Sequence, residues 1–130
     1  MFGLTVTIKN EVEKVRQAGR DAARKSFART AFLIRQSAVQ SVEKAAGASS
    51  PGSPPHTHRR MFLRRAIRYH ADKEGAVIGP QFSVFGVAAQ AHEFGGEFRK
   101  GTYPKRPFMG PALDKNLAAF AGSFRGSVSR

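Results

Sequence analysis

The hydrophobic and polar positions along the chain predict helices alternating with short strands. Residues 4–8 (LTVTI) alternate apolar and hydroxyl side chains and include β-branched residues, which is typical of a strand. Asn10 is expected to end that strand and to cap a helix, with Glu13 completing a capping box. From Val12 to about Ala45, apolar or small residues recur every three to five positions, which predicts one long helix.

Such a helix is too long for a small chain to cover. About 35 helical residues span roughly 50 Å. The core of a chain of only 130 residues cannot cover a helix of that length from end to end. Either Gly19 breaks the helix, or another subunit covers part of its apolar stripe. Gly47 supplies a stop signal after the last apolar position.

The middle of the chain predicts a loop and then a hairpin. Residues 47–58 (GASSPGSPPHTH) concentrate Gly, Ser and Pro, the composition of a loop or arm within one domain. Residues 67–71 and 76–78 carry β-favouring side chains around the turn DKEG, which predicts a β-hairpin. The preceding RRMFLRR (59–65) fits either a helical turn or the beginning of the first strand.

Further along, the pattern predicts two shorter helices and an edge strand. Residues 83–94 place apolar side chains on one helical face, and two glycines follow as a stop signal. Residues 97–100 fit a short edge strand. Pro111 is expected to begin a last helix that extends to about Phe120.

These elements together predict an α+β fold. We expect a long N-terminal helix and two shorter helices packed on a small antiparallel β-sheet. The chain is expected to form a single domain over residues 1–130, with a frayed C-terminus from about residue 122.

Charge is the strongest compositional signal. Lys and Arg number 22 against nine Asp and Glu, a formal net charge of +13. The excess is +5 over residues 1–50, +4 over 51–80 and +4 over 81–130, so it belongs to the whole domain and not to a tail. We therefore expect the domain to lie beside a polyanion or an acidic protein surface. The absence of Cys excludes disulfides and thiol nucleophiles.

The densest positive charge is a cluster of five arginines within ten residues. Arg forks bind phosphate and carboxylate groups in a bidentate manner, so the cluster is a candidate contact with a DNA channel or with an acidic partner. A solvated, solubilising face is the simpler alternative. The arginine cluster consists of Arg59, Arg60, Arg64, Arg65 and Arg68.

A stiff, proline-rich strip at residues 102–116 is the second candidate surface. Three prolines hold extended chain, which docks at a small entropic cost. Either the strip forms a subunit or ring interface, or it packs the last helix on the chain's own core. The candidate interface residues are Pro104, Pro107, Phe108, Met109 and Pro111.

No catalytic or metal-binding pattern emerges. His56 and His58 lie two apart without a nearby carboxylate, which makes a poor ligand set. His92 begins a zincin-like pair with Glu93, but Gly96 stands where the second histidine is required. We expect no enzyme activity, no cofactor and no metal. No membrane span or signal peptide is predicted either.

Several short motifs, taken in order, resemble a bacteriophage family over about residues 10–120. Besides the long charged helix, they are SPGSPPH (50–56), LRRAI (63–67), VIGP (77–80), AHEFGG (91–96) and PKRPFMGPALD (104–114). The chain resembles the small neck and tail-completion (head–tail joining) proteins of tailed phages, the group around virion morphogenesis proteins and minor tail proteins of the Z type. Many of these carry Thr-Gly before the Leu-Arg segment, where this chain has residues 59–62 (RRMF).

The resemblance implies a structural virion protein, made in the host cytoplasm and incorporated in the neck or tail. It would form a homo-oligomeric ring of six or twelve copies between the head-completion or connector protein and the tail tube or tail terminator protein. Packaged double-stranded DNA would pass through the ring. A nonspecific, basic nucleic-acid-binding protein is the alternative.

Overall fold

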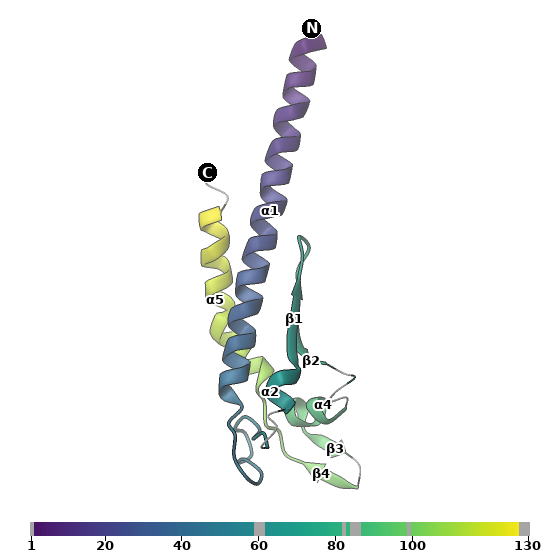
Figure 1. Cartoon of the computed structure of the whole chain (residues 1–130), viewed down its shortest axis with the longest axis vertical. Coiled ribbons are helices and arrows are strands. Elements are labelled where there is room, and N and C mark those ends of the chain that lie inside the picture. The colour runs from purple at the N-terminus through teal and green to yellow at the C-terminus, as the bar shows by residue number, and fades with distance from the viewer. Residues whose placement is uncertain (1, 59–61, 82, 84–86, 99, 128–130) are drawn as a thin grey trace.

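A single 40-residue helix, α1 (Phe2–Ser41), is the axis along which the rest of the chain packs (Figure 1). A helix of this length spans about 60 Å. It continues through Gly19 without a break. The computed structural model describes residues 2–58, 62–81, 83, 87–98 and 100–127, and within these ranges the side chains of residues 12–122.

The strand predicted at residues 4–8 is wrong, because these residues belong to α1. Each residue added to an existing helix gains a hydrogen bond without a new nucleation step, and β-branched residues reduce that gain by only about 0.5 kcal/mol each. Asn10, predicted as the N-cap, consequently lies inside the helix. The helix ends at Ser41, four residues before the predicted end, and Gly47, at φ 77°, lies in the following loop.

The predicted hairpin is confirmed by β1 (Ile67–Ala71) and β2 (Ala76–Pro80), which pair antiparallel. In its turn the Asp72 carboxylate accepts the backbone N–H of Glu74 at 2.7 Å and that of Gly75 at 3.1 Å. These hydrogen bonds lower the pKa of Asp72, because they stabilise the charged carboxylate.

A second hairpin follows in the C-terminal third. It pairs β3 (Gly96–Phe98) with β4 (Gly101–Tyr103), so the predicted edge strand exists and has a partner that the pattern did not reveal. The two hairpins form separate two-stranded sheets. The α+β class is thereby confirmed, although the β-structure is divided between two small sheets.

Three more helices, α2, α4 and α5, lie within the described residues. The first, α2 (Phe62–Ala66), shows that the residues before β1 form a helical turn. Next, α4 (Val87–Phe94) ends where Gly95 and Gly96 adopt φ values of 68° and 104°. The last, α5 (Met109–Ser127), begins two residues before Pro111 and extends seven residues beyond the predicted end.

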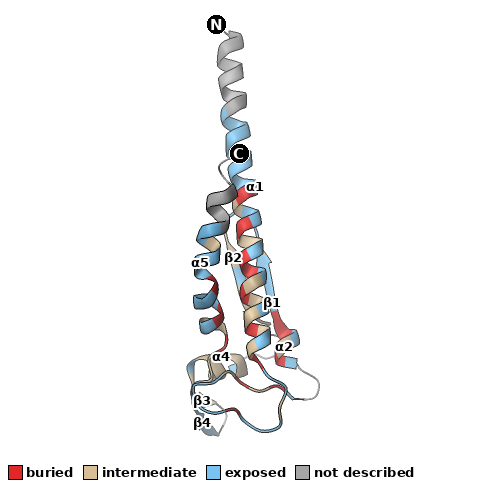
Figure 2. Ribbon diagram, turned by 90° about the vertical axis from the view of Figure 1, so that its left-hand side faces the viewer, coloured by how far each residue is buried: buried red, intermediate tan, exposed pale blue. Residues whose placement is uncertain are grey.

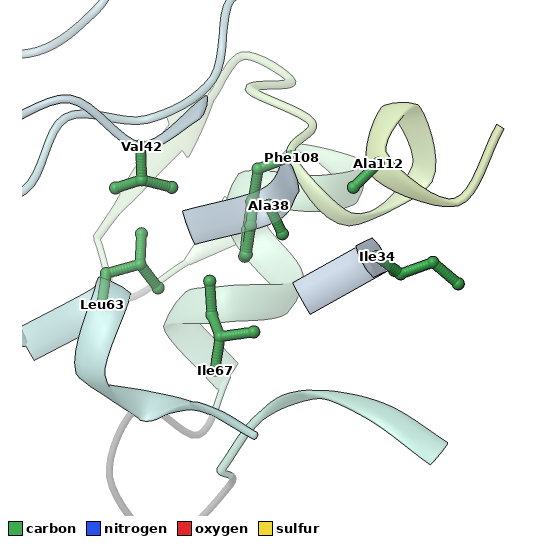
Figure 3. Packing of buried hydrophobic residues seen from close by; sticks show 7 residues of the cluster. All are labelled: Ile34, Ala38, Val42, Leu63, Ile67, Phe108 and Ala112. Carbon is green, nitrogen blue, oxygen red and sulfur yellow. The ribbon is translucent and has the colours of Figure 1, made fainter. Parts of the chain in front are cut away.

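The core lies between the C-terminal half of α1, the helical turn α2, strand β1 and the beginning of α5. Helix α5 runs alongside this half of α1 in the opposite direction (Figure 1). Figure 3 shows Phe108 beside Ala38, with Leu63 and Ile67 facing them. The buried cluster comprises Ile34, Ala38, Val42, Leu63, Ile67, Phe108 and Ala112.

Two further contacts join α5 to α1. The rings of Phe27 and Phe120 stack with their centroids 5.2 Å apart. The Asn116 side-chain amide donates to the Ser37 hydroxyl at 2.9 Å. Together with the core cluster, these contacts cover α1 from about Ala22 downward, whereas the part nearer the N-terminus projects beyond the end of α5 (Figure 1).

The loop rich in Gly, Ser and Pro closes back on itself. Its two ends meet where the backbone N–H of Thr57 donates to the Glu43 carbonyl at 2.8 Å. Its tip is held at Gly52, whose N–H donates to the Lys105 carbonyl at 2.7 Å. The segment is thus a closed loop fastened to the chain before α5.

Candidate functional site

The described members of the arginine cluster differ in their surroundings. Arg64 is half-buried, and its Nε donates to the Val39 carbonyl at 3.1 Å. Val39 lies in the last turn of α1, where backbone carbonyls lack partners within the helix. Arg64 therefore caps the C-terminus of α1 and places positive charge at the negative end of its dipole.

Only part of the arginine cluster lies on the described surface. Arg65 on α2 and Arg68 on β1 are exposed. Arg59 and Arg60 lie outside the described residues. Contact of these arginines with a DNA channel or an acidic partner stays a prediction, and Arg64 additionally bonds the Val39 carbonyl.

The proline-rich strip is also divided. Phe108 is 1% exposed and belongs to the core cluster, so its side chain packs the last helix on the chain's own core and is wrong as an interface residue. Met109 is half-buried against the same core, and Pro107 is half-buried. Of the five candidate interface residues, Pro104 and Pro111 are exposed.

Glu93 has a role that the sequence pattern did not suggest. Its carboxylate accepts the backbone N–H groups of Phe108, Met109 and Gly110, at 3.0, 3.0 and 2.7 Å. N–H groups at the beginning of a helix have no acceptor within the helix itself, and the helix dipole also favours a negative charge there. Glu93 on α4 therefore fixes where α5 begins. An acidic residue 15 positions before a Pro-rich helix start gives no local signal of this contact.

A continuous exposed surface lies on the N-terminal half of α1. Residues 12–21 are all exposed, including Val15 at 71% (Figure 2). Val12, Val15, Gly19 and Ala22 are spaced three, four and three residues apart, so they share one helical face. This stripe leads directly into the positions that are buried lower down the helix.

The same helix carries an exposed set of basic side chains. They alternate with only two acidic residues over positions 12–29, so this stretch has a net positive charge. These six basic residues outnumber the two arginines of the predicted cluster, Arg65 and Arg68, that are described and exposed. The basic residues are Lys14, Arg16, Arg20, Arg24, Lys25 and Arg29.

The acidic turn of the first hairpin lies across a cavity from this basic stretch. The cavity has a volume of about 460 Å³, and both Arg20 and Arg24 line it together with Asp72 and Glu74. The hairpin therefore places two of the nine acidic residues of the chain close to α1.

Within the described part of the chain, no three His, Asp or Glu side chains are grouped so that they would hold a metal ion. His56 and His58 instead line a pocket together with His92. None of the described helices combines the length and apolar character needed to cross a membrane.

Comparison with protein-family models, with curated proteins and with solved structures finds no match to this chain. Its function is therefore inferred from the geometry of the described residues and from the sequence motifs.

Proposed function

We propose that the protein is a structural virion protein of a tailed phage. In this proposal, copies of the chain form a ring in the neck of the particle, joining the head connector to the tail tube around the DNA channel. No catalysis is assigned to it. The single observation that carries the proposal is the length of α1 left uncovered by its own chain.

The uncovered segment is long enough to need a partner. Residues 2–21 span about 30 Å of helix, and every described side chain from 12 to 21 is exposed. In proteins most of the stability of a helix comes from the packing of its apolar face, and the side chains of residues 12–21 are exposed. A neighbouring copy supplies such a surface without any additional protein.

A ring requires two different contact surfaces on each copy, because its interface is heterologous. Helix α5 offers the second surface, since Leu113 and Leu117 are exposed one helical turn apart. We assign the Val12–Val15 stripe of one copy to the Leu113–Leu117 stripe of the next. Both stripes lie on helices, so they pack as an ordinary helix pair.

Charge supports the same arrangement. Each copy contributes a net charge of +13, and a ring concentrates that charge around its central opening. Duplex DNA carries one negative charge about every 1.7 Å of its axis. A positively charged opening therefore attracts DNA without reading its sequence.

The proposal is tested by the mass and shape of the purified assembly. We expect light scattering and negative-stain electron microscopy to show closed rings of six or twelve copies, alone or on addition of tail-tube protein. A chain that stays at its 14.2 kDa monomer mass under both conditions contradicts the proposal.

A pair of matched variants tests the interface. Val15→Glu places a charge in the proposed contact, whereas Gln17→Glu places the same charge about 160° around the helix. Both positions are exposed, and Glu is a good helix former at each. We expect the first variant to prevent assembly and the second to leave it intact.

A nonspecific nucleic-acid-binding protein is the second candidate, favoured by the six exposed basic residues on α1. Such a protein holds duplex DNA at physiological salt as a monomer and releases it steeply as salt rises. Replacing Arg16, Arg20 and Arg24 by Gln would then lower the salt slope by nearly one for each of these arginines that pairs with a phosphate. Gln at the exposed lysines 100, 105 and 115 is the matched control.

A further inference from the structure

A pocket at the base of the molecule gathers positive and hydrogen-bonding side chains from segments far apart in sequence. Its volume is about 470 Å³, and it lies between the closed loop, α2, α4 and the chain after β4. His56, His58, His92 and Arg106 line it. Among the described residues that form its wall, none carries a carboxylate.

Arg106 is fixed at the wall of this pocket by two hydrogen bonds. Its backbone N–H donates to the His92 carbonyl at 2.6 Å, and its Nε donates to the Ser49 carbonyl at 2.9 Å. The structure gives the two terminal nitrogens of the guanidinium no hydrogen bond to the described residues. The guanidinium is thus held in place while its two terminal nitrogens keep their N–H donors. These two nitrogens can bind an oxyanion in a bidentate manner.

Two other groups of the pocket also lack a hydrogen-bond partner. The Ser49 side chain is 7% exposed, and its hydroxyl finds no such partner among the described residues. An unpaired buried hydroxyl costs free energy. The His92 ring makes no hydrogen bond within the described part of the chain, and burial together with the charge of Arg106 lowers its pKa.

The rest of the wall is apolar and aromatic. Leu63 and Pro55 are buried there, and Phe62 and Tyr103 also line the pocket. Apolar and aromatic side chains around a few fixed polar groups are the usual lining of a small-molecule site. The charged donors select the end of a ligand, and the rings select its body.

We propose that this pocket binds an oxyanion, a carboxylate or a phosphate group, carried on a flat apolar body. The inference is independent of the ring proposed above, because the pocket is complete within one chain. It also differs from metal binding, since the three histidines line the pocket together with the cationic Arg106 and with no carboxylate among the described wall residues.

The proposal is tested by NMR titration of the histidine ring signals in a buffer free of phosphate and carboxylate. Benzoate and phenyl phosphate represent the two anion sources, and benzamide is the neutral control of the same shape as benzoate. We expect saturable shifts of the His58 and His92 signals with the anions alone, and a rise in the pKa of His92 when the anion is bound. The tighter of the two anions identifies the source.

Matched variants locate the binding. Arg106→Gln is expected to weaken anion binding about tenfold or more, because a hydrogen bond to a charged group is lost. Arg29→Gln removes the same charge from exposed α1 and is expected to bind like the wild type. Because Arg106 also holds the closed loop, its fold is checked by circular dichroism, and the exposed His58→Gln variant gives a second, milder loss. Equal shifts with benzamide, no saturable shift, or unchanged affinity in both pocket variants would overturn the proposal.

Discussion

The two halves of α1 belong to one continuous helix but have opposite surroundings. In the C-terminal half, Ala31, Ile34 and Ala38 are buried under α5 and the first hairpin. In the N-terminal half, residues 12–21 are exposed throughout, although the apolar stripe continues there. The length of a helix and the burial of its side chains therefore have different causes. Local hydrogen bonding extends a helix, whereas burial depends on what the chain has available to place against it.

The largest expected effect is on the core that covers the C-terminal half. Phe108→Ala should lower the free energy of unfolding by about 3–5 kcal/mol, because it removes a buried ring and leaves a cavity. Urea unfolding measures this loss. Phe94, which is 69% exposed on α4, gives the control, and Phe94→Ala should change the stability by less than about 0.5 kcal/mol.

The same substitution at two positions of α1 compares its halves directly. Ala38 is 0% exposed, so Ala38→Leu should overpack the core and destabilise the chain by about 1–3 kcal/mol. Ala18 is exposed, and Ala18→Leu should leave the monomer within about 0.5 kcal/mol of the wild type. Equal losses at the two positions in thermal or urea unfolding would refute the division of α1 into a covered and an uncovered half.

The contact that positions α5 against the covered half should matter somewhat less. Glu93→Gln keeps the size of the side chain but loses the charge that accepts three backbone N–H groups. We expect a loss of about 1–2 kcal/mol in urea unfolding. The exposed Glu97→Gln on β3 should lose almost nothing. A loss at Glu97 as large as that at Glu93 would contradict the capping role.

The smallest effect concerns pH. Burial, and secondarily the charge of Arg106, lower the pKa of His92 from its ordinary value of 6.5. The unfolded chain then binds a proton before the folded chain does, so this ring makes the folded state less stable as pH falls below about 6.5. Because the ring is half-buried and screened by solvent, we expect less than about 1 kcal/mol. His92→Gln should reduce the loss of unfolding free energy between about pH 6.5 and lower pH, measured by urea unfolding. The same pH dependence in the variant and the wild type would contradict this role of His92.

The sequence predicted the elements that depend on local pattern. The long helix, the hairpin around Asp72 and the helix stop at Gly95 all rest on periodicity or on turn residues, and the structure confirms them. The strand at residues 4–8 failed because its alternation also suits a helix that is already extending, and the described structure offers it no strand to pair with.

The hydrophobic and polar pattern of the sequence did not predict contacts between distant segments. Arg64 reaches the Val39 carbonyl across 25 positions, and Glu93 reaches the beginning of α5 across 15 or more. Phe108 was one of two alternatives in the sequence, an interface or a core residue, and only its three-dimensional neighbours decide between them. The pocket around Arg106 likewise unites four segments that share no local motif.

The central claim is that another copy of the chain packs on the N-terminal half of α1. Backbone hydrogen exchange, measured for the free chain and for the ring, tests it most directly. We predict that residues 12–21 exchange rapidly in the free chain and become protected on assembly, whereas residues 31–41 are protected in both states. Exchange at residues 12–21 that is equally slow in the free chain, or unchanged by assembly, would contradict the claim.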